Sequence, residues 1–195
     1  MLASDNIVPL NLPNILTLLR VAAIPLLVAF CYLGSKYATL WATGLFLLAA
    51  VTDWLDGWLA RRSGQTTAFG AFLDPVADKL IVATALVLLT ERFDNPVITV
   101  SACVIVGREI VVSALREWMA QIGQHAHVRV STIGKVKTAV QMVAITLLLA
   151  QMPGVGYPLW FWLAQGLLLI AVVLTLWSMF LYLRAFMRVV GEGVL

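Results

Sequence analysis

Long apolar stretches dominate this chain, and short polar segments separate them. A helix that crosses a membrane needs about 20 mostly apolar residues. Six segments meet this requirement, at roughly residues 14–33, 37–60, 71–90, 96–118, 135–152 and 158–183. No charge occurs from Thr138 to Leu183, which is too long for one crossing, and the turn-forming run from Pro153 to Pro158 divides it. We therefore predict an all-α polytopic membrane protein with six transmembrane helices in a single domain, residues 1–195.

The composition favours lipid as the solvent. Of the 195 residues, 62% are hydrophobic and 12% are charged, which is about half the charged fraction of a soluble domain. The segment from Met1 to Asn14 has no Lys or Arg and does not read as a signal peptide. The net charge of +3 could suggest nucleic acid, but the basic residues lie beside the apolar segments. A membrane surface and anionic substrates are the expected partners, and nucleic acid is not.

Basic residues indicate how the helices are oriented, because loops rich in Lys and Arg remain in the cytoplasm. In a six-span arrangement most of them fall near one face: Arg61, Arg62, Arg116, Arg129, Lys135, Lys137, Arg184 and Arg188. Only Lys36 and Arg92 fall on the opposite face. Both termini are therefore expected in the cytoplasm.

Four aspartates are the most informative feature. Asp53 and Asp56 are three residues apart and Asp74 and Asp78 are four apart, so each pair shares one helix face. The turn after Ser63 should bring all four acids together at the cytoplasmic membrane edge. Clustered carboxylates there are costly unless a cation compensates them, and Mg²⁺ or Mn²⁺ is the natural one. Two ions would balance four ionised acids and could also bind phosphate oxygens.

A simpler interpretation is that these acids form salt bridges with Arg61, Arg62 and Lys79, or cap helices. Asp74 precedes Pro75 and would make a suitable helix N-cap. Neither idea explains the small residues among the acids, which allow close approach of a ligand or a facing helix. These residues are Gly57, Ala60 and Gly70.

At these positions the sequence resembles the CDP-alcohol phosphotransferase family. The family signature is DxxDGxxAR, eight residues, G, three residues, D, three residues, D. Every specified position matches: Asp53, Asp56, Gly57, Ala60, Arg61, Gly70, Asp74 and Asp78. Three further segments resemble the branch of the family that makes phosphatidylglycerophosphate: Asn11–Thr17, Gly107–Ile110 and Gly134–Thr138.

The resemblance implies a six-helix homodimer in a bacterial inner membrane, with its active site facing the cytoplasm. It implies two Mg²⁺ or Mn²⁺ ions per subunit, held by Asp53, Asp56, Asp74 and Asp78. The residues implied for CDP-diacylglycerol binding are Asp56, Gly57, Ala60, Arg61 and Gly70. Asp78 is implied as the base that deprotonates the acceptor. The implied reaction transfers the phosphatidyl group of CDP-diacylglycerol to glycerol 3-phosphate, giving CMP and phosphatidylglycerophosphate, the committed step to phosphatidylglycerol and cardiolipin.

An acceptor that carries a phosphate needs cations, because a guanidinium can grip two phosphate oxygens and lysine adds a compact charge. The candidates on the predicted cytoplasmic side are Arg20, Arg108, Lys135 and Lys137. Alternatively, these residues only follow the positive-inside rule. An ion pair between Arg108 and Glu109 is also possible, although neighbours on a helix do not face each other.

Two other functions stay open. The same chemistry could use another acceptor, such as inositol phosphate, because charge alone does not separate two phosphorylated alcohols. A cation transporter could use the aspartates as its binding site. Transporter sites lie near the bilayer midplane, often between internal repeats, whereas these acids are expected at one edge and the sequence has no apparent repeat. The transporter is therefore less favoured.

Overall fold

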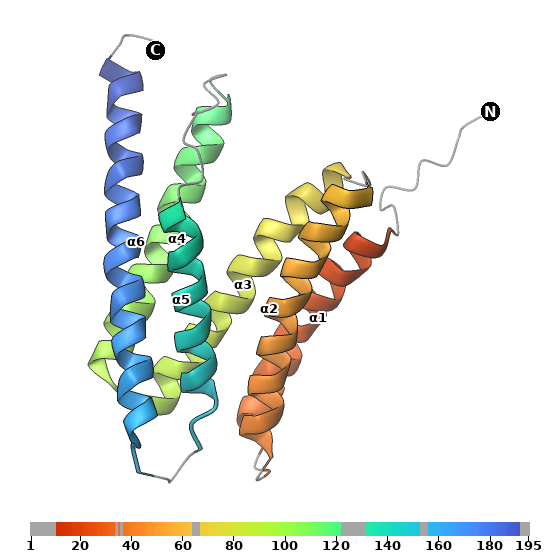
Figure 1. The fold of residues 1–195 in the computed structure, drawn as a ribbon, viewed down its shortest axis with the longest axis vertical. Coiled ribbons are helices and arrows are strands. Elements are labelled where there is room, and N and C mark those ends of the chain that lie inside the picture. The colour runs from red at the N-terminus through yellow and green to blue at the C-terminus, as the bar shows by residue number, and fades with distance from the viewer. Residues whose placement is uncertain are drawn as a thin grey trace, which may run out of the picture. The chain divides into compact units, whose positions relative to one another are not determined.

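Six helices account for nearly all of the described chain. The computed structural model describes residues 11–33, 35, 37–63, 67–121, 132–152 and 156–191. In chain order the helices are α1 (Leu12–Tyr32), α2 (Ala38–Ser63), α3 (Ala68–Phe93), α4 (Pro96–Gln121), α5 (Thr132–Leu149) and α6 (Leu159–Gly191). These residues include no strand. The prediction of an all-α protein with six helices is confirmed (Figure 1).

Three helices are long and apolar enough to cross a membrane. Within the residues described, these spans are Asn14–Tyr32, Pro96–Gln121 and Leu159–Arg184. Shorter apolar stretches occupy Ala38–Asp53 in α2 and Val136–Leu149 in α5. The three long spans indicate a membrane protein, while membrane crossing by α2, α3 and α5 stays a prediction.

The chain forms two compact units, Met1–Leu88 and Leu89–Leu195, and the boundary lies within α3. In the first unit α1 packs against α2, with Leu27 and Phe46 among the fully buried side chains. In the second unit α6 packs against both α4 and α5 (Figure 1). The prediction of a single domain, residues 1–195, stays a prediction.

Helix α3 begins before Asp74. The side-chain oxygen Oγ1 of Thr67 accepts a hydrogen bond from the backbone N–H of Gly70 at 3.0 Å, which is the geometry of an N-cap. Pro75 lies inside the helix. The interpretation of Asp74 as the N-cap was therefore wrong, because Thr67 supplies the cap further upstream.

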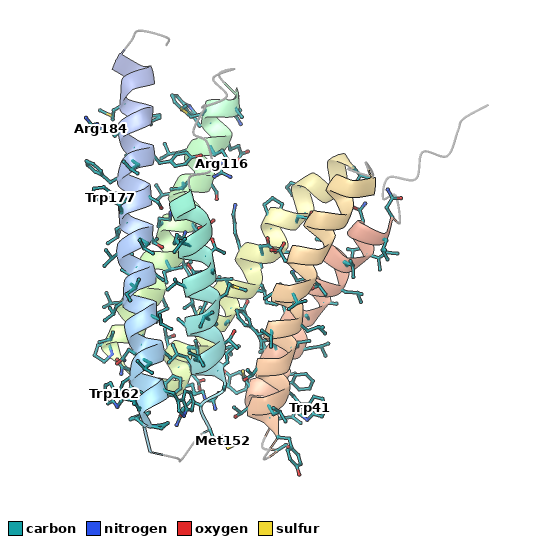
Figure 2. The ribbon with its side chains drawn as sticks, viewed as in Figure 1. Trp41, Arg116, Met152, Trp162, Trp177 and Arg184 are labelled. Carbon is teal, nitrogen blue, oxygen red and sulfur yellow. The ribbon has the colours of Figure 1, made fainter. Side chains whose placement is uncertain are left out.

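Three arginines of the second unit, Arg92, Arg116 and Arg184, lie towards its two ends. Figure 2 shows Arg116 and Arg184 towards one end of this unit and Trp162 and Met152 towards the other. At the Met152 end, Arg92 donates from Nη1 to the carbonyl of Leu149 at 3.2 Å and from Nη2 to the carbonyl of Gln151. The first is the last carbonyl of α5 and the second lies two residues beyond its end, and a cation can cap such a helix terminus. The separation of Arg92 from Arg116 and Arg184 agrees with the predicted division, while the cytoplasmic assignment stays a prediction.

Candidate active site

A buried arginine of α1 brings two of the aspartates together. Nη1 of Arg20 lies 2.5 Å from Oδ1 of Asp78 and 3.3 Å from Oδ1 of Asp53. The arginine side chain is 1% exposed, whereas those of Asp53 and Asp78 are 48% and 40% exposed. Residues of α1, α2 and α3 therefore meet at one point, where the cation is buried and the two carboxyl groups remain open to solvent.

Asp74, another aspartate of the signature, is bonded to α1 at a position one turn before Asp78. Oγ1 of Thr17 donates a hydrogen bond to Oδ1 of Asp74. Thr17 is buried and lies one turn before Arg20 on α1, as Asp74 lies one turn before Asp78 on α3. We call Asp53, Asp74 and Asp78 the acidic cluster. The structure describes only the helical backbone of four predicted site residues: Asp56, Gly57, Ala60 and Arg61.

Gly70 is explained by the helix that faces it. A Cβ atom at this position would overlap Oδ1 of Asn14 and would lie 3.1 Å from Oγ1 of Thr67. Asn14 is buried, and its Nδ2 donates to Oγ1 of Thr67 at 3.0 Å. Of the two interpretations left open for Gly70, close approach of a facing helix is the one that these contacts favour.

The donor chemistry of the acidic cluster suits a hard divalent cation, because carboxylate oxygens are the ligands that Mg²⁺ and Mn²⁺ prefer. Asp53 and Asp78 approach one cation, Arg20, through one oxygen each. Among the described side chains, no group of three or more acids, histidines or cysteines is close enough to hold a metal. The fourth predicted ligand, Asp56, lies outside that set.

Arg20 was predicted as a ligand for the acceptor phosphate, and the structure shows it between carboxylates. Its contacts with Asp53 and Asp78 are the kind of salt bridge that the simpler interpretation of the acids required, but with an α1 arginine as the partner. Two of the three partners proposed from the sequence, Arg61 and Arg62, have side chains outside the described region, and the third, Lys79, lies on α3.

A second polar group lies in the other unit, where it joins α4, α5 and α6. Nη1 of Arg108 contacts Oε2 of Glu109 at 2.8 Å, and Nη2 donates to Oγ of Ser178 at 3.0 Å. Nζ of Lys137 lies 3.8 Å from the same Glu109 oxygen. We call these four residues the cationic cluster. The side chain of Lys135, the remaining predicted phosphate ligand, is outside the described set.

The cationic cluster has a surplus of positive charge and of donors. Arg108 and Lys137 have side chains only 12% and 8% exposed, and Glu109 compensates one of the two charges. Within the described part of the chain, Nε of Arg108 is buried and has no hydrogen-bond partner. The ion pair between Arg108 and Glu109 forms although neighbours on a helix do not face each other. An anion would satisfy both the spare charge and the spare donor.

Comparison with known proteins shows the family of the chain. Residues 10–177 match the family described as CDP-alcohol phosphatidyltransferase. The chain belongs to this family. It is 53% identical over 177 residues to the CDP-diacylglycerol–glycerol-3-phosphate 3-phosphatidyltransferase of Pseudomonas fluorescens, covering 90% of each chain. Proteins of the same name from Sodalis glossinidius and Pectobacterium atrosepticum are 53% and 52% identical, over 90% of this chain and 94% of theirs. The family membership predicted from the signature is confirmed.

The structure also adds residues to which the sequence reasoning gave no role. Asn14 and Thr17 were singled out only as part of a segment that resembles the family, and Ser178 was not singled out at all. Their common signal is a polar residue within an apolar helix, since such a group needs a hydrogen-bond partner. That signal shows that a partner exists without showing which one.

Proposed function

We infer that this phosphatidyltransferase transfers the phosphatidyl group of CDP-diacylglycerol to glycerol 3-phosphate, releasing CMP and phosphatidylglycerophosphate. The names of the relatives support this reaction. The observation that carries it in this chain is the meeting of Asp53 and Asp78 at the buried Arg20, because it assembles signature residues of α2 and α3 at one point.

The acids Asp53, Asp56, Asp74 and Asp78 hold two Mg²⁺ or Mn²⁺ ions in this proposal. Bound ions of this kind neutralise a pyrophosphate and the charge that develops on a leaving nucleotide. The exposure of Asp53 and Asp78 supports this assignment, because oxygens open to solvent are accessible to an ion while Arg20 compensates them from the buried side.

Asp78 is the general base of the proposed reaction. The primary hydroxyl of glycerol 3-phosphate attacks the phosphorus that carries diacylglycerol, a P–O bond forms, and the bond to the CMP oxygen breaks with its electron pair leaving on CMP. The hydroxyl proton passes to Asp78. Arg20 donates a hydrogen bond to Oδ1 of Asp78, which orients the carboxyl group that would accept the proton.

Arg108 and Lys137 bind the phosphate of the acceptor. The spare positive charge of the cationic cluster and the buried Nε of Arg108 support this role. Lys135 lies two residues before Lys137 and is proposed to assist. Neutralising Arg108 or Lys137 should raise KM for glycerol 3-phosphate about 10- to 100-fold, because a hydrogen bond to a charged group is worth about 1.5–3 kcal/mol. An unchanged KM in both variants would mean that these cations determine only the orientation of the helices in the membrane.

The membrane arrangement completes the proposal. All six helices cross the inner membrane of a bacterium, the active site faces the cytoplasm, and two chains form a homodimer. The three long apolar helices and the bacterial relatives support the membrane location.

The function is tested by CMP release from the purified protein with CDP-diacylglycerol and Mg²⁺. Glycerol 3-phosphate, inositol phosphate, inositol, serine and phosphatidylglycerol are compared as acceptors. Release with glycerol 3-phosphate alone, abolished by EDTA and restored by Mg²⁺, is the expected result. Release with a different acceptor would contradict the acceptor assignment, and undiminished release in EDTA would contradict the metal assignment.

A further inference from the structure

Helix α1 carries three buried polar residues at intervals of three, although it is one of the long apolar helices. Asn14, Thr17 and Arg20 are 2%, 1% and 2% exposed. A buried polar group in an apolar environment is costly unless it is hydrogen-bonded. Their partners therefore indicate what this face of α1 is for.

Each of the three residues contacts a successive position at the start of α3. Asn14 bonds Thr67, which caps the helix, Thr17 bonds Asp74, and Arg20 bonds Asp78. The contacts advance along both helices in the same order. Two of the three residues bond aspartates of the acidic cluster. Helix packing alone would not require these polar contacts with the acids.

Thr17 makes a hydrogen bond that leaves its own helix, whereas hydrogen bonds of several other described threonines stay within one helix or its cap. A threonine in a helix commonly donates its hydroxyl proton to the backbone carbonyl four residues earlier. Four described threonines do so: Thr43, Thr99, Thr138 and Thr146. Thr17 donates across helices to Oδ1 of Asp74.

A hydroxyl donor on one carboxylate oxygen restricts the rotation of the carboxyl group and leaves lone pairs for another ligand. Groups that orient a metal ligand in this way commonly change metal affinity 10- to 100-fold when they are removed. We propose that Thr17 is a positioning residue, whose hydroxyl holds the Asp74 carboxylate in the orientation that coordinates a divalent cation. This inference rests on the proposed function of Asp74 as a metal ligand.

The test compares Thr17→Val, which keeps the volume and loses the donor, with Thr17→Ser, which keeps the donor. Binding of Mn²⁺ to the purified full-length protein without substrates is followed by the EPR signal of free Mn²⁺. We expect Thr17→Val to bind Mn²⁺ about 10- to 100-fold more weakly and Thr17→Ser to stay within a few-fold of wild type. The Mg²⁺ concentration for half-maximal CMP release should rise in parallel, with KM for glycerol 3-phosphate unchanged.

Two controls separate positioning from general damage. Thr43→Val removes a hydroxyl that bonds its own helix, at 2.7 Å from the carbonyl of Thr39, and should leave Mn²⁺ binding unchanged. In an Asp74→Asn background, Thr17→Val should cause no further loss of Mn²⁺ affinity. If Thr17→Val does not purify as folded protein, Thr17→Ala removes the same donor with a smaller side chain.

The proposal is overturned if Thr17→Val binds Mn²⁺ like wild type, if Thr17→Ser is as weak as Thr17→Val, or if the loss persists undiminished in the Asp74→Asn background. Failure of the proposed function gives a different result. In that case the wild-type protein itself binds no Mn²⁺, and the positioning role of Thr17 is lost with it.

Discussion

Replacing Gly70 with alanine tests how closely α1 and α3 approach each other. In an ordinary helix interior this change stabilises by about 1 kcal/mol, because alanine is the better helix former. Here the added Cβ would overlap Oδ1 of the buried Asn14 and would lie 3.1 Å from Oγ1 of Thr67. Overpacking of this kind costs about 1–3 kcal/mol. The net effect of Gly70→Ala is therefore expected to be a destabilisation of up to about 2 kcal/mol.

Gly44 provides the matched control, because it also lies within a helix of the first unit and a Cβ there would meet nothing within 4 Å. Gly44→Ala should be neutral or stabilising by up to about 1 kcal/mol. The two variants should then differ by about 1–3 kcal/mol. For a chain of this size 1 kcal/mol corresponds to about 2–4 °C, so their Tm values should differ by about 2–12 °C, with Gly70→Ala lower.

The assay is thermal unfolding of each purified variant in one detergent at one scan rate, because unfolding of membrane proteins is commonly irreversible and Tm then depends on the rate. Asn14→Ala identifies the source of the effect. Combined with Gly70→Ala, it removes the atom that the new Cβ would meet, so the double variant should lose less stability than the two single changes together. A Gly70→Ala protein as stable as Gly44→Ala, or additive losses in the double variant, would refute the reasoning.

Three further outcomes are expected. Asp78→Asn should lower kcat for CMP release about 10²- to 10⁴-fold at saturating Mg²⁺, and wild-type turnover would exclude Asp78 as the base. Arg20→Gln should raise KM for CDP-diacylglycerol more than KM for glycerol 3-phosphate, because Arg20 contacts carboxylates of the acidic cluster; the reverse would restore Arg20 as an acceptor ligand. Arg92→Met should lower Tm by several degrees, since it removes about 1.5–3 kcal/mol of charged hydrogen bonding to the end of α5, and the activity of the folded enzyme should be unchanged.

The number of helices and the approximate place of each could be predicted from the sequence because apolar runs of sufficient length stand out against polar turns. The pairing of Asp74 and Asp78 on one face also follows from helical spacing alone. The start of α3 could not be predicted correctly. Pro75 is typical of a helix start, and a threonine cap at Thr67 is visible only once the hydrogen bond to Gly70 is known.

The sequence did not predict which side chains the buried polar residues would contact. Arg20 was expected to bind phosphate because a cation near acids on the cytoplasmic side suits either role, and the sequence does not say which atoms of α2 and α3 approach α1. Thr17 is similar, because most threonines in apolar helices bond their own backbone. Its pairing with Asp74 depends on how two helices far apart in the sequence are packed.

The position of Arg20 changes the charge balance of the proposed metal site. With all four signature aspartates ionised, two divalent cations alone would give a neutral site. Arg20, which lies against Asp53 and Asp78, adds one positive charge, so the loaded site attracts a pyrophosphate. With only one divalent cation the same site would stay net negative and would repel it. The buried arginine would therefore make the two-ion site net positive instead of neutral, which is why its loss should raise KM for CDP-diacylglycerol.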